Sequence, residues 1–152
     1  ELKPVDLKVG VESALAMVQG RFPTQTVNTA LGAVPLLTGY GKQLNQAFLA
    51  ILTNALQAVS QGGEVFVTLE TQGDEAVVTF RDTGVGIPAE QLPKVFDPFF
   101  TTRPVGEGSG LGLTTAYSVV ERHNGEINLT STVGAGTTVS VRLPLVGLAQ
   151  EG

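Results

Sequence analysis

The sequence contains no cysteine and only one histidine, His123. Without cysteine the chain has no disulfide framework, no thiolate zinc site and no cysteine nucleophile. A single histidine also excludes a metal centre built from several imidazole rings. We therefore expect any metal in this protein to be bound by oxygen atoms.

Long apolar runs and an excess of basic residues are absent too. No stretch approaches the roughly 20 apolar residues that span a bilayer, and the N-terminus has no signal-peptide pattern. Nine Lys and Arg residues stand against 14 Asp and Glu residues, which gives a net charge of −5. This charge argues against nonspecific nucleic-acid binding, which would need a basic face to replace counterions around the phosphates. The sequence predicts a soluble, cytoplasmic domain that contacts neither nucleic acid nor membrane, whether or not the full-length protein is membrane-anchored.

The 152 residues are enough for one domain with a buried core, and 42% hydrophobic residues with 19 glycines suit an α/β or α+β fold with tight turns. Residues 1–6 look like a linker from a preceding domain. We interpret 7–145 as the folded domain and 146–152 as a C-terminal tail, and we expect the chain to be a fragment of a longer protein.

Hydrophobic periodicity predicts both helices and strands. Apolar residues recur at helical spacing in three segments, and Asp6 is placed to cap the first of them. Alternating and β-branched residues indicate strands, with turns at residues 72–74 and 134–136. The predicted helices are 6–18, 41–60 and 110–122, and the predicted strands are 24–31, 34–38, 64–70, 76–80, 126–131 and 137–143.

Residues 83–109 form a segment of about 27 residues without long periodicity. A loop of this length in a compact domain is usually functional or disordered, and a lid is a common functional case. Its aromatic residues would be an exposed liability unless they dock, so we expect Phe96 and at least one of Phe99 and Phe100 to anchor the loop. Arg103, whose guanidinium can fork onto phosphate oxygens, is the better candidate for a ligand contact.

A glycine run, Gly-Glu-Gly-Ser-Gly-Leu-Gly-Leu at 106–113, lies between this loop and the last predicted helix. Glycines let backbone N–H groups approach an anion, and the following helix points its positive dipole end at the same place. The run is neither a dinucleotide fingerprint, which follows the first strand of a βαβ unit, nor a P-loop, which ends in Gly-Lys-Ser/Thr. It predicts a phosphate cradle.

Asp82 ends a predicted strand and begins a turn with Gly84 and Gly86. Such an aspartate can simply accept hydrogen bonds from the N–H groups of its own turn. Alternatively, its carboxylate accepts from the exocyclic amine of adenine, while the glycines let the purine edge come close and the carbonyl of guanine is disfavoured. The apolar neighbours either form walls around the base or belong to the ordinary core: Val85, Ile87 and Leu113.

Asn54 is a polar residue within the strongly amphipathic helix predicted at 41–60. One interpretation is an asparagine on the helix surface or one hydrogen-bonded to a neighbouring loop. The other is an amide oxygen bound to Mg²⁺, a cation that takes few protein ligands and completes its octahedron with water and phosphate oxygens. The neighbouring motifs favour the magnesium site.

Together these motifs resemble the N, G1, F and G2 boxes of sensor histidine kinases, in order and spacing: Asn54 within 46–58, then 82–88, 96–103 and 106–113. The Phe-Phe-Thr-Thr-Arg sequence at 99–103 is similar to the nitrogen-regulation sensor subgroup. The resemblance covers nearly the whole chain and implies the catalytic, ATP-binding domain of such a kinase. It also implies a Bergerat-type α/β two-layer sandwich, in which helices cover one face of a mixed, mainly antiparallel sheet and hold the nucleotide under a long ATP lid.

The resemblance implies ATP and Mg²⁺ as cofactors and assigns roles to residues. Asn54 would bind Mg²⁺, Asp82 would recognise adenine, and Thr137 would join the water network beneath the base. Arg103 would be the catalytic residue that stabilises the transferring phosphoryl group. The implied nucleotide-binding residues are Asn54, Gln57, Ala58, Asp82, Gly84, Gly86, Ile87, Thr101, Thr102, Arg103, Gly108, Ser109, Gly110, Leu111, Gly112, Leu113 and Thr137.

Two features depart from the family pattern. Ala50 stands where many relatives have a second asparagine, and where gyrase and chaperone ATPases of the same superfold have the glutamate that activates water. Alanine cannot act as a base, which favours a kinase with an external nucleophile over a hydrolase. His123 lies in the last turn of a predicted helix, where a histidine commonly satisfies free carbonyls and the negative dipole end, so the phosphoacceptor histidine is expected elsewhere.

The implied partner is a histidine-containing dimerisation domain of the same kinase, with a response regulator contacted indirectly. The isolated domain would be a monomer and the full-length protein a homodimer. Two other functions stay open. One is a protein-serine kinase of the anti-sigma-factor type, which the long Phe-rich lid fits less well. The other is a non-catalytic nucleotide-sensing module, which the intact Asn54, Asp82 and glycine run disfavour.

Overall fold

The computed structural model describes residues 2–59, 62–86 and 112–146, and within these ranges the chain forms three helices and seven strands. In chain order they are β1 (Lys3–Val5), α1 (Leu7–Val18), β2 (Thr26–Leu31), β3 (Leu37–Gly39), α2 (Gly41–Ala58), β4 (Glu64–Gln72), β5 (Glu75–Asp82), α3 (Gly112–Arg122), β6 (Glu126–Thr132) and β7 (Gly136–Pro144).

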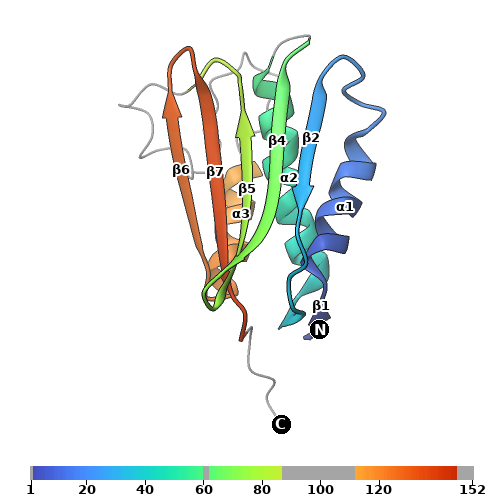
Figure 1. Cartoon of the computed structure of the whole chain (residues 1–152), viewed down its shortest axis with the longest axis vertical. Helices are drawn as coiled ribbons and strands as arrows, with labels where there is room; N and C mark the ends of the chain where they lie inside the picture. The colour runs from blue at the N-terminus through green and yellow to red at the C-terminus, as the bar shows by residue number, and fades with distance from the viewer. Residues whose placement is uncertain (1, 60–61, 87–111, 147–152) are drawn as a thin grey trace.

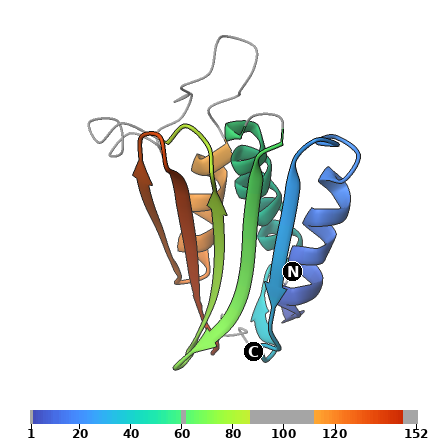
Figure 2. The same ribbon diagram turned by 45° about the horizontal axis from the view of Figure 1, so that its top comes forward.

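Five strands form the main sheet, in the order β2-β4-β5-β7-β6. The β2 and β4 strands are parallel, and the other neighbours are antiparallel. The β1 and β3 strands pair separately as a two-stranded antiparallel sheet. The described helices all lie on one face of the main sheet (Figures 1 and 2). The predicted two-layer sandwich with a mixed, mainly antiparallel sheet is confirmed.

The central helix of the helical layer is α2, which packs against α1, α3 and the sheet. Its apolar residues recur every three or four positions and form a buried stripe, as the periodicity predicts. Within this stripe the Phe48 ring lies 6.3 Å from the ring of Phe80 on β5. The α2–β5 contact therefore lies in the core, and it fixes the helix against the strand that ends at Asp82.

Helix α1 begins where the sequence predicts. The Asp6 carboxylate oxygen Oδ1 accepts hydrogen bonds from the N–H groups of Lys8 (3.0 Å) and Val9 (3.4 Å), which confirms the N-cap. Among the described helices, none is long and apolar enough to cross a membrane.

Several element ends differ from the prediction. The β4–β5 hairpin is longer, because its strands stay in register from Val65–Asp82 to Gln72–Glu75. Helix α2 ends at Ala58, because Val59 is already extended. The β1 strand was not predicted at all, since three residues that include a proline carry no usable periodicity. Residues 110 and 111 of the last predicted helix lie outside the described residues.

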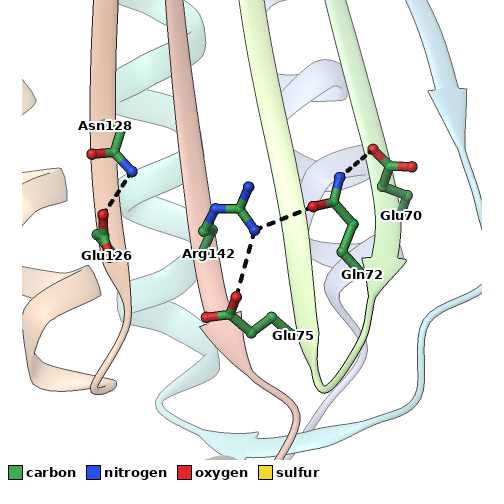
Figure 3. A network of polar contacts seen from close by, with 6 residues as sticks. All are labelled: Glu70, Gln72, Glu75, Glu126, Asn128 and Arg142. Carbon is green, nitrogen blue, oxygen red and sulfur yellow. Dashed lines mark hydrogen bonds and ion pairs between the residues drawn. The ribbon is translucent and has the colours of Figure 1, made fainter.

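The face of the sheet opposite the helices carries polar side chains. Arg142 donates from Nη1 to the side-chain oxygens of Gln72 (3.2 Å) and Glu75 (3.5 Å), and Gln72 in turn donates to Glu70 (Figure 3). Val77 lies between Glu70 and Arg142 in the strand register and is only 3% exposed. The long polar side chains thus cover an apolar residue on an otherwise open face.

Candidate functional site

A row of polar residues crosses the helix-covered face of the sheet at one end. The strand register places Asp82 on β5 opposite Val65 on β4, and Thr137 on β7 opposite Ser131 on β6. Arg81 pairs with Thr138, so Thr137 is the cross-strand neighbour of Asp82. The next row along the same face is entirely apolar: Val67, Phe80, Val139 and Leu129.

This polar row lies at the edge where β5 and β6 end, β7 begins and α2 ends (top of Figure 1). Asp82 is 5% exposed and Thr137 is 8% exposed, and both continue an inward-facing apolar pattern. Polar groups buried at such positions need partners. The row therefore places two buried polar side chains directly above an apolar core.

The Asp82 carboxylate is only partly satisfied. Its Oδ1 atom accepts hydrogen bonds from the N–H groups of Gly84 (2.9 Å) and Thr137 (3.2 Å). The Oδ2 atom has no hydrogen-bond partner in the part of the chain that the structure describes. Burial raises the pKa of Asp82 above its ordinary value, and the two backbone hydrogen bonds oppose that rise. The hydrogen bond from Gly84 is the one expected of a turn-forming aspartate. The burial of the side chain and its bond from Thr137 on β7 are not explained by a turn alone.

The Thr137 hydroxyl extends the row toward β6. Its Oγ1 lies 2.8 Å from the Oγ of Ser131, and this serine hydroxyl also donates to the Gly136 carbonyl at 3.1 Å. Ser131 is not among the residues predicted from the sequence. No local signal marks it, because a serine near the end of an amphipathic strand resembles a surface residue, and only the β6–β7 register brings it to Thr137.

Gly84 and Gly86 hold the turn after β5 against two other elements. A Cβ at Gly84 would lie 2.8 Å from the carbonyl carbon of Ala58 and would overlap its oxygen. A Cβ at Gly86, which has φ +78°, would overlap the Thr132 carbonyl oxygen. The glycines thus have a packing role that the sequence did not indicate, and Gly84 brings the turn against the end of α2.

The predicted α2 residues lie at the same end of the domain. Asn54 and Ala58 are half-buried, and Gln57 is exposed. Asn54 already takes part in an interaction within the structure. In the described ranges, no group of three or more His, Cys, Asp or Glu side chains could hold a metal ion.

Of the remaining predicted residues, some lie within the described ranges and the others lie outside them. Leu113, 8% exposed, belongs to the hydrophobic core, whereas Val85 is 69% exposed. Gly112 opens α3. The others lie outside the described residues, as do the predicted loop anchors: Ile87, Phe96, Phe99, Phe100, Thr101, Thr102, Arg103, Gly108, Ser109, Gly110 and Leu111.

His123 has a structural role. Its ring is 2% exposed, its Nε2 accepts from the Tyr40 N–H at 2.9 Å, and its Nδ1 lies 2.8 Å from the Val119 carbonyl oxygen. Because a backbone N–H can only donate, Nε2 is unprotonated and Nδ1–H donates to Val119. Burial lowers the pKa of His123, and neighbouring Arg122 lowers it further. The ring satisfies a helix carbonyl as predicted, but as a neutral group that also joins α3 to the start of α2.

The neutral state of His123 predicts a stability change with pH. The folded-state pKa of His123 lies below the unfolded value of about 6.5. Its contribution to the free energy of unfolding is therefore fully present above that pH and is lost as the pH falls below it. We expect the wild-type free energy of unfolding to fall by up to about 1.4 kcal/mol per pH unit in this range relative to His123→Gln. Urea denaturation of both proteins at several pH values measures the difference, and parallel curves would contradict the assignment.

A family model described as histidine kinase-, DNA gyrase B-, and HSP90-like ATPase matches residues 39–147. The chain belongs to this ATPase family. It is 34% identical over 147 residues to the sensor histidine kinase ZraS of Escherichia coli K12, across 95% of this chain and 31% of ZraS. It is 37% identical over 110 residues to sporulation kinase E of Bacillus subtilis, across 72% of this chain and 15% of that kinase. The chain thus spans less than a third of these relatives.

Solved structures of histidine kinases are also similar to this chain. The mycobacterial sensor histidine kinase MprB superposes with a TM-score of 0.85 at 29% identity, over 97% of this chain and 98% of that one. The catalytic domain of histidine kinase ThkA superposes equally well, with a TM-score of 0.85 over 95% of this chain, and at 21% identity it supports the fold alone. The chain is an ATP-binding catalytic domain of the sensor histidine kinase type.

Proposed function

We propose that this domain binds Mg·ATP and transfers the γ-phosphoryl group to a histidine on a separate dimerisation domain. The observation that carries the proposal is the buried Asp82 carboxylate, held through Oδ1 by Gly84 and Thr137 with Oδ2 left for a ligand. A buried carboxylate oxygen without a hydrogen-bond partner costs free energy. A ligand that donates a hydrogen bond to Oδ2 would remove that cost and so explains why an aspartate lies here.

The exocyclic amine of adenine is such a donor. A carboxylate that accepts from it favours adenine over purines that have a carbonyl at the same position, because two acceptors facing each other are left unpaired. The end of α2 lies against the turn that carries Asp82, so Ala58 and Gly84 would border the same ligand. The predicted phosphate contacts of 108–112 and of Arg103 belong to the proposal as well.

The Mg²⁺ assignment relies on Asn54. Its half-buried amide on α2 lies among apolar neighbours and offers a neutral oxygen of the kind that Mg²⁺ accepts beside phosphate and water. When bound, the cation would neutralise charge on the β- and γ-phosphates. Ala50, one turn earlier on α2, supplies no base for water, which supports transfer to an external nucleophile instead of hydrolysis.

The histidine that receives the phosphoryl group must lie outside this chain. His123, its sole histidine, is buried and hydrogen-bonded on both ring nitrogens. The relatives ZraS and sporulation kinase E are much longer proteins, which leaves room for a dimerisation domain with its own histidine. A response regulator would then receive the phosphoryl group from that domain, in a homodimeric full-length kinase.

A transfer assay tests the proposal. The chain is mixed with [γ-³²P]ATP, Mg²⁺ and the dimerisation domain of its own full-length kinase, and the label is tested for stability in acid and alkali. We expect an acid-labile, alkali-stable phosphohistidine. Acid-stable phosphoserine on a partner protein would point to the anti-sigma-factor type of kinase, and nucleotide binding without any transfer would point to a sensing module.

Removal of the predicted magnesium ligand should separate two kinds of binding. We expect Asn54→Ala to weaken ATP binding in the presence of Mg²⁺ by about 10-fold or more, and to change binding in EDTA much less. Calorimetric titrations under both conditions measure this. Gln46→Ala, an exposed change on the same helix, is the matched control and should leave both affinities unchanged. Equal losses with and without Mg²⁺ would contradict the metal role.

A further inference from the structure

The strand β2 lies at one edge of the main sheet, and its outer side has no partner strand in the described part of the chain. The parallel register with β4 divides its backbone groups into two sets. The Thr26 N–H donates to the Gly63 carbonyl, so the even-numbered residues of β2 bond to β4. The N–H and C=O groups of Val27, Thr29 and Leu31 therefore point outward along the open edge.

This edge lacks the features that usually protect an exposed strand. Natural edge strands carry charged side chains, proline or a bulge, which keep other strands away. The β2 strand has the sequence Thr-Val-Asn-Thr-Ala-Leu with continuous register, and residues 22–41 contain no charged side chain. Six residues of open, uncharged edge are enough for an extended peptide to add as a further strand.

A groove runs beside this edge, between β2 and α1. Helix α1 packs on α2, has few contacts with β2, and lies on the outer side of that strand in both views (Figures 1 and 2). The groove has a volume of about 480 Å³, and its apolar lining comes from both helices, β2 and the loop before it: Leu15, Ala16, Val18, Phe22, Val27 and Leu56. Of these, Leu15, Phe22 and Val27 are only partly buried. Apolar side chains are thus left uncovered between α1 and the edge strand.

An added strand would bring every second side chain to this groove. Val27 and Thr29 lie opposite the buried Val65 and Val67 of β4 and line the groove, so they mark the helix-facing side of β2. Because side chains alternate along a strand, residues i, i+2 and i+4 of the added segment would face the same side. Apolar side chains at these positions would cover the lining that α1 and β2 leave open.

A single extended segment fits this site better than a second copy of the chain. A second copy paired through β2 would bring its own α1 to the space that the first α1 occupies at the edge (Figures 1 and 2). Among the described residues that line the groove, Glu12 is the one with a charge, and the chain as a whole has a net charge of −5. A segment with a basic side chain beside Glu12 is therefore complementary, whereas an acidic segment is repelled.

We propose that β2 and the groove beside it bind an extended segment of a partner protein by strand addition. The backbone of the segment pairs with Val27, Thr29 and Leu31. Its helix-facing side chains are apolar, except for a Lys or Arg at the position nearest Glu12. This edge is separated from Asp82 on β5 by the whole of β4, so the proposal does not depend on nucleotide binding.

Two dye-labelled peptides with blocked ends serve as probes: Thr-Val-Thr-Leu-Thr-Lys-Thr and its reverse sequence, because the segment can run in either direction along β2. Fluorescence anisotropy measures their binding to the chain. We expect one of them to bind. The same peptide with Glu in place of Lys should bind about threefold more weakly or worse, because the charge faces Glu12.

Thr29→Pro tests the backbone pairing. It removes an outward N–H and keeps the bonds to β4, and proline is tolerated on an edge strand at such a position. We expect peptide affinity to fall about tenfold or more, whereas Thr29→Val keeps the N–H and should bind like the wild type. Glu12→Lys should reverse the preference between the Lys and Glu peptides. Ser13→Lys, an exposed change on α1 outside the groove, should keep the wild-type preference.

The proposal is overturned if neither peptide binds the wild type at millimolar concentration, or if Thr29→Pro binds as tightly as Thr29→Val. Self-association in sedimentation experiments that Thr29→Pro abolishes would assign the edge to a second copy and would also overturn it. If circular dichroism shows that Thr29→Pro does not fold, Glu12→Lys decides. An unchanged preference for the Lys peptide in that variant would then contradict the proposed site.

Discussion

Asp82→Asn is expected to lower ATP affinity by roughly 10- to 100-fold while leaving the domain folded, as expected for the loss of a hydrogen bond to a charged group. The asparagine oxygen can take the place of Oδ1 and keep the hydrogen bonds from Gly84 and Thr137. Its amide nitrogen then occupies the place of Oδ2, where a donor would face the donor amine of adenine. Titrations with ATP measure the loss, and ITP should gain affinity because its carbonyl meets the new N–H group.

The same substitution should not lower stability. The folded-state pKa of Asp82 is raised, so the carboxyl group favours folding most when it is protonated, and this contribution is lost as the pH rises through the folded pKa. At neutral pH the ionised, buried carboxylate thus opposes folding, and a neutral amide removes that effect. We expect the ligand-free melting temperature of Asp82→Asn to match or exceed that of the wild type.

Asp74→Asn is the matched control for Asp82→Asn. It makes the same chemical change at the turn between β4 and β5, at the far end of the strands from the candidate site. Both nucleotide affinity and melting temperature should stay at wild-type values. If Asp82→Asn bound ATP as tightly as this control, adenine recognition by Asp82 would be wrong, and if it unfolded, the carboxylate would be structural.

The features that the sequence predicted correctly depend on short stretches of chain. The buried stripe of α2 follows from its apolar spacing, and the Asp6 cap follows from one side chain and the two N–H groups beside it. The hairpin between β4 and β5 follows from alternation around a glycine turn. Asp82 could be selected because it ends such a strand next to two glycines. In each case the sequence signal lies within a short stretch of the chain.

The features that the sequence did not predict join distant segments. The Tyr40 N–H that fixes the tautomer of His123 lies 83 positions away in the chain. The packing of Gly84 on Ala58, and the hydrogen bond from the Thr137 N–H to Asp82, depend on how α2 and the strands are aligned in three dimensions. Periodicity assigns a face to a residue but does not choose its cross-strand neighbour. For that reason Asp82 could be proposed from the sequence, whereas the partners that set its chemistry could not.

Gly136→Ala should be the most destabilising single change at this end of the sheet. Gly136 begins β7 with φ +114°, a conformation that side chains with a Cβ rarely adopt, and a Cβ there would overlap the Asp82 carbonyl oxygen. Strained backbone and overpacking each contribute about 1–3 kcal/mol, so we expect the free energy of unfolding to fall by roughly 3 kcal/mol or more. Urea denaturation measures it.

Gly134→Ala separates these two causes. Gly134 lies in the same turn with φ +86°, but a Cβ there would meet no atom within 4 Å. It should lower the free energy of unfolding by only the conformational cost, about 1–2 kcal/mol. If the two variants were equally destabilised, contact with Asp82 would contribute nothing. A larger loss in Gly136→Ala, with weakened ATP binding where the variant still folds, would instead indicate that Gly136 lets β7 approach β5 closely enough for the Thr137 N–H to reach the Asp82 carboxylate.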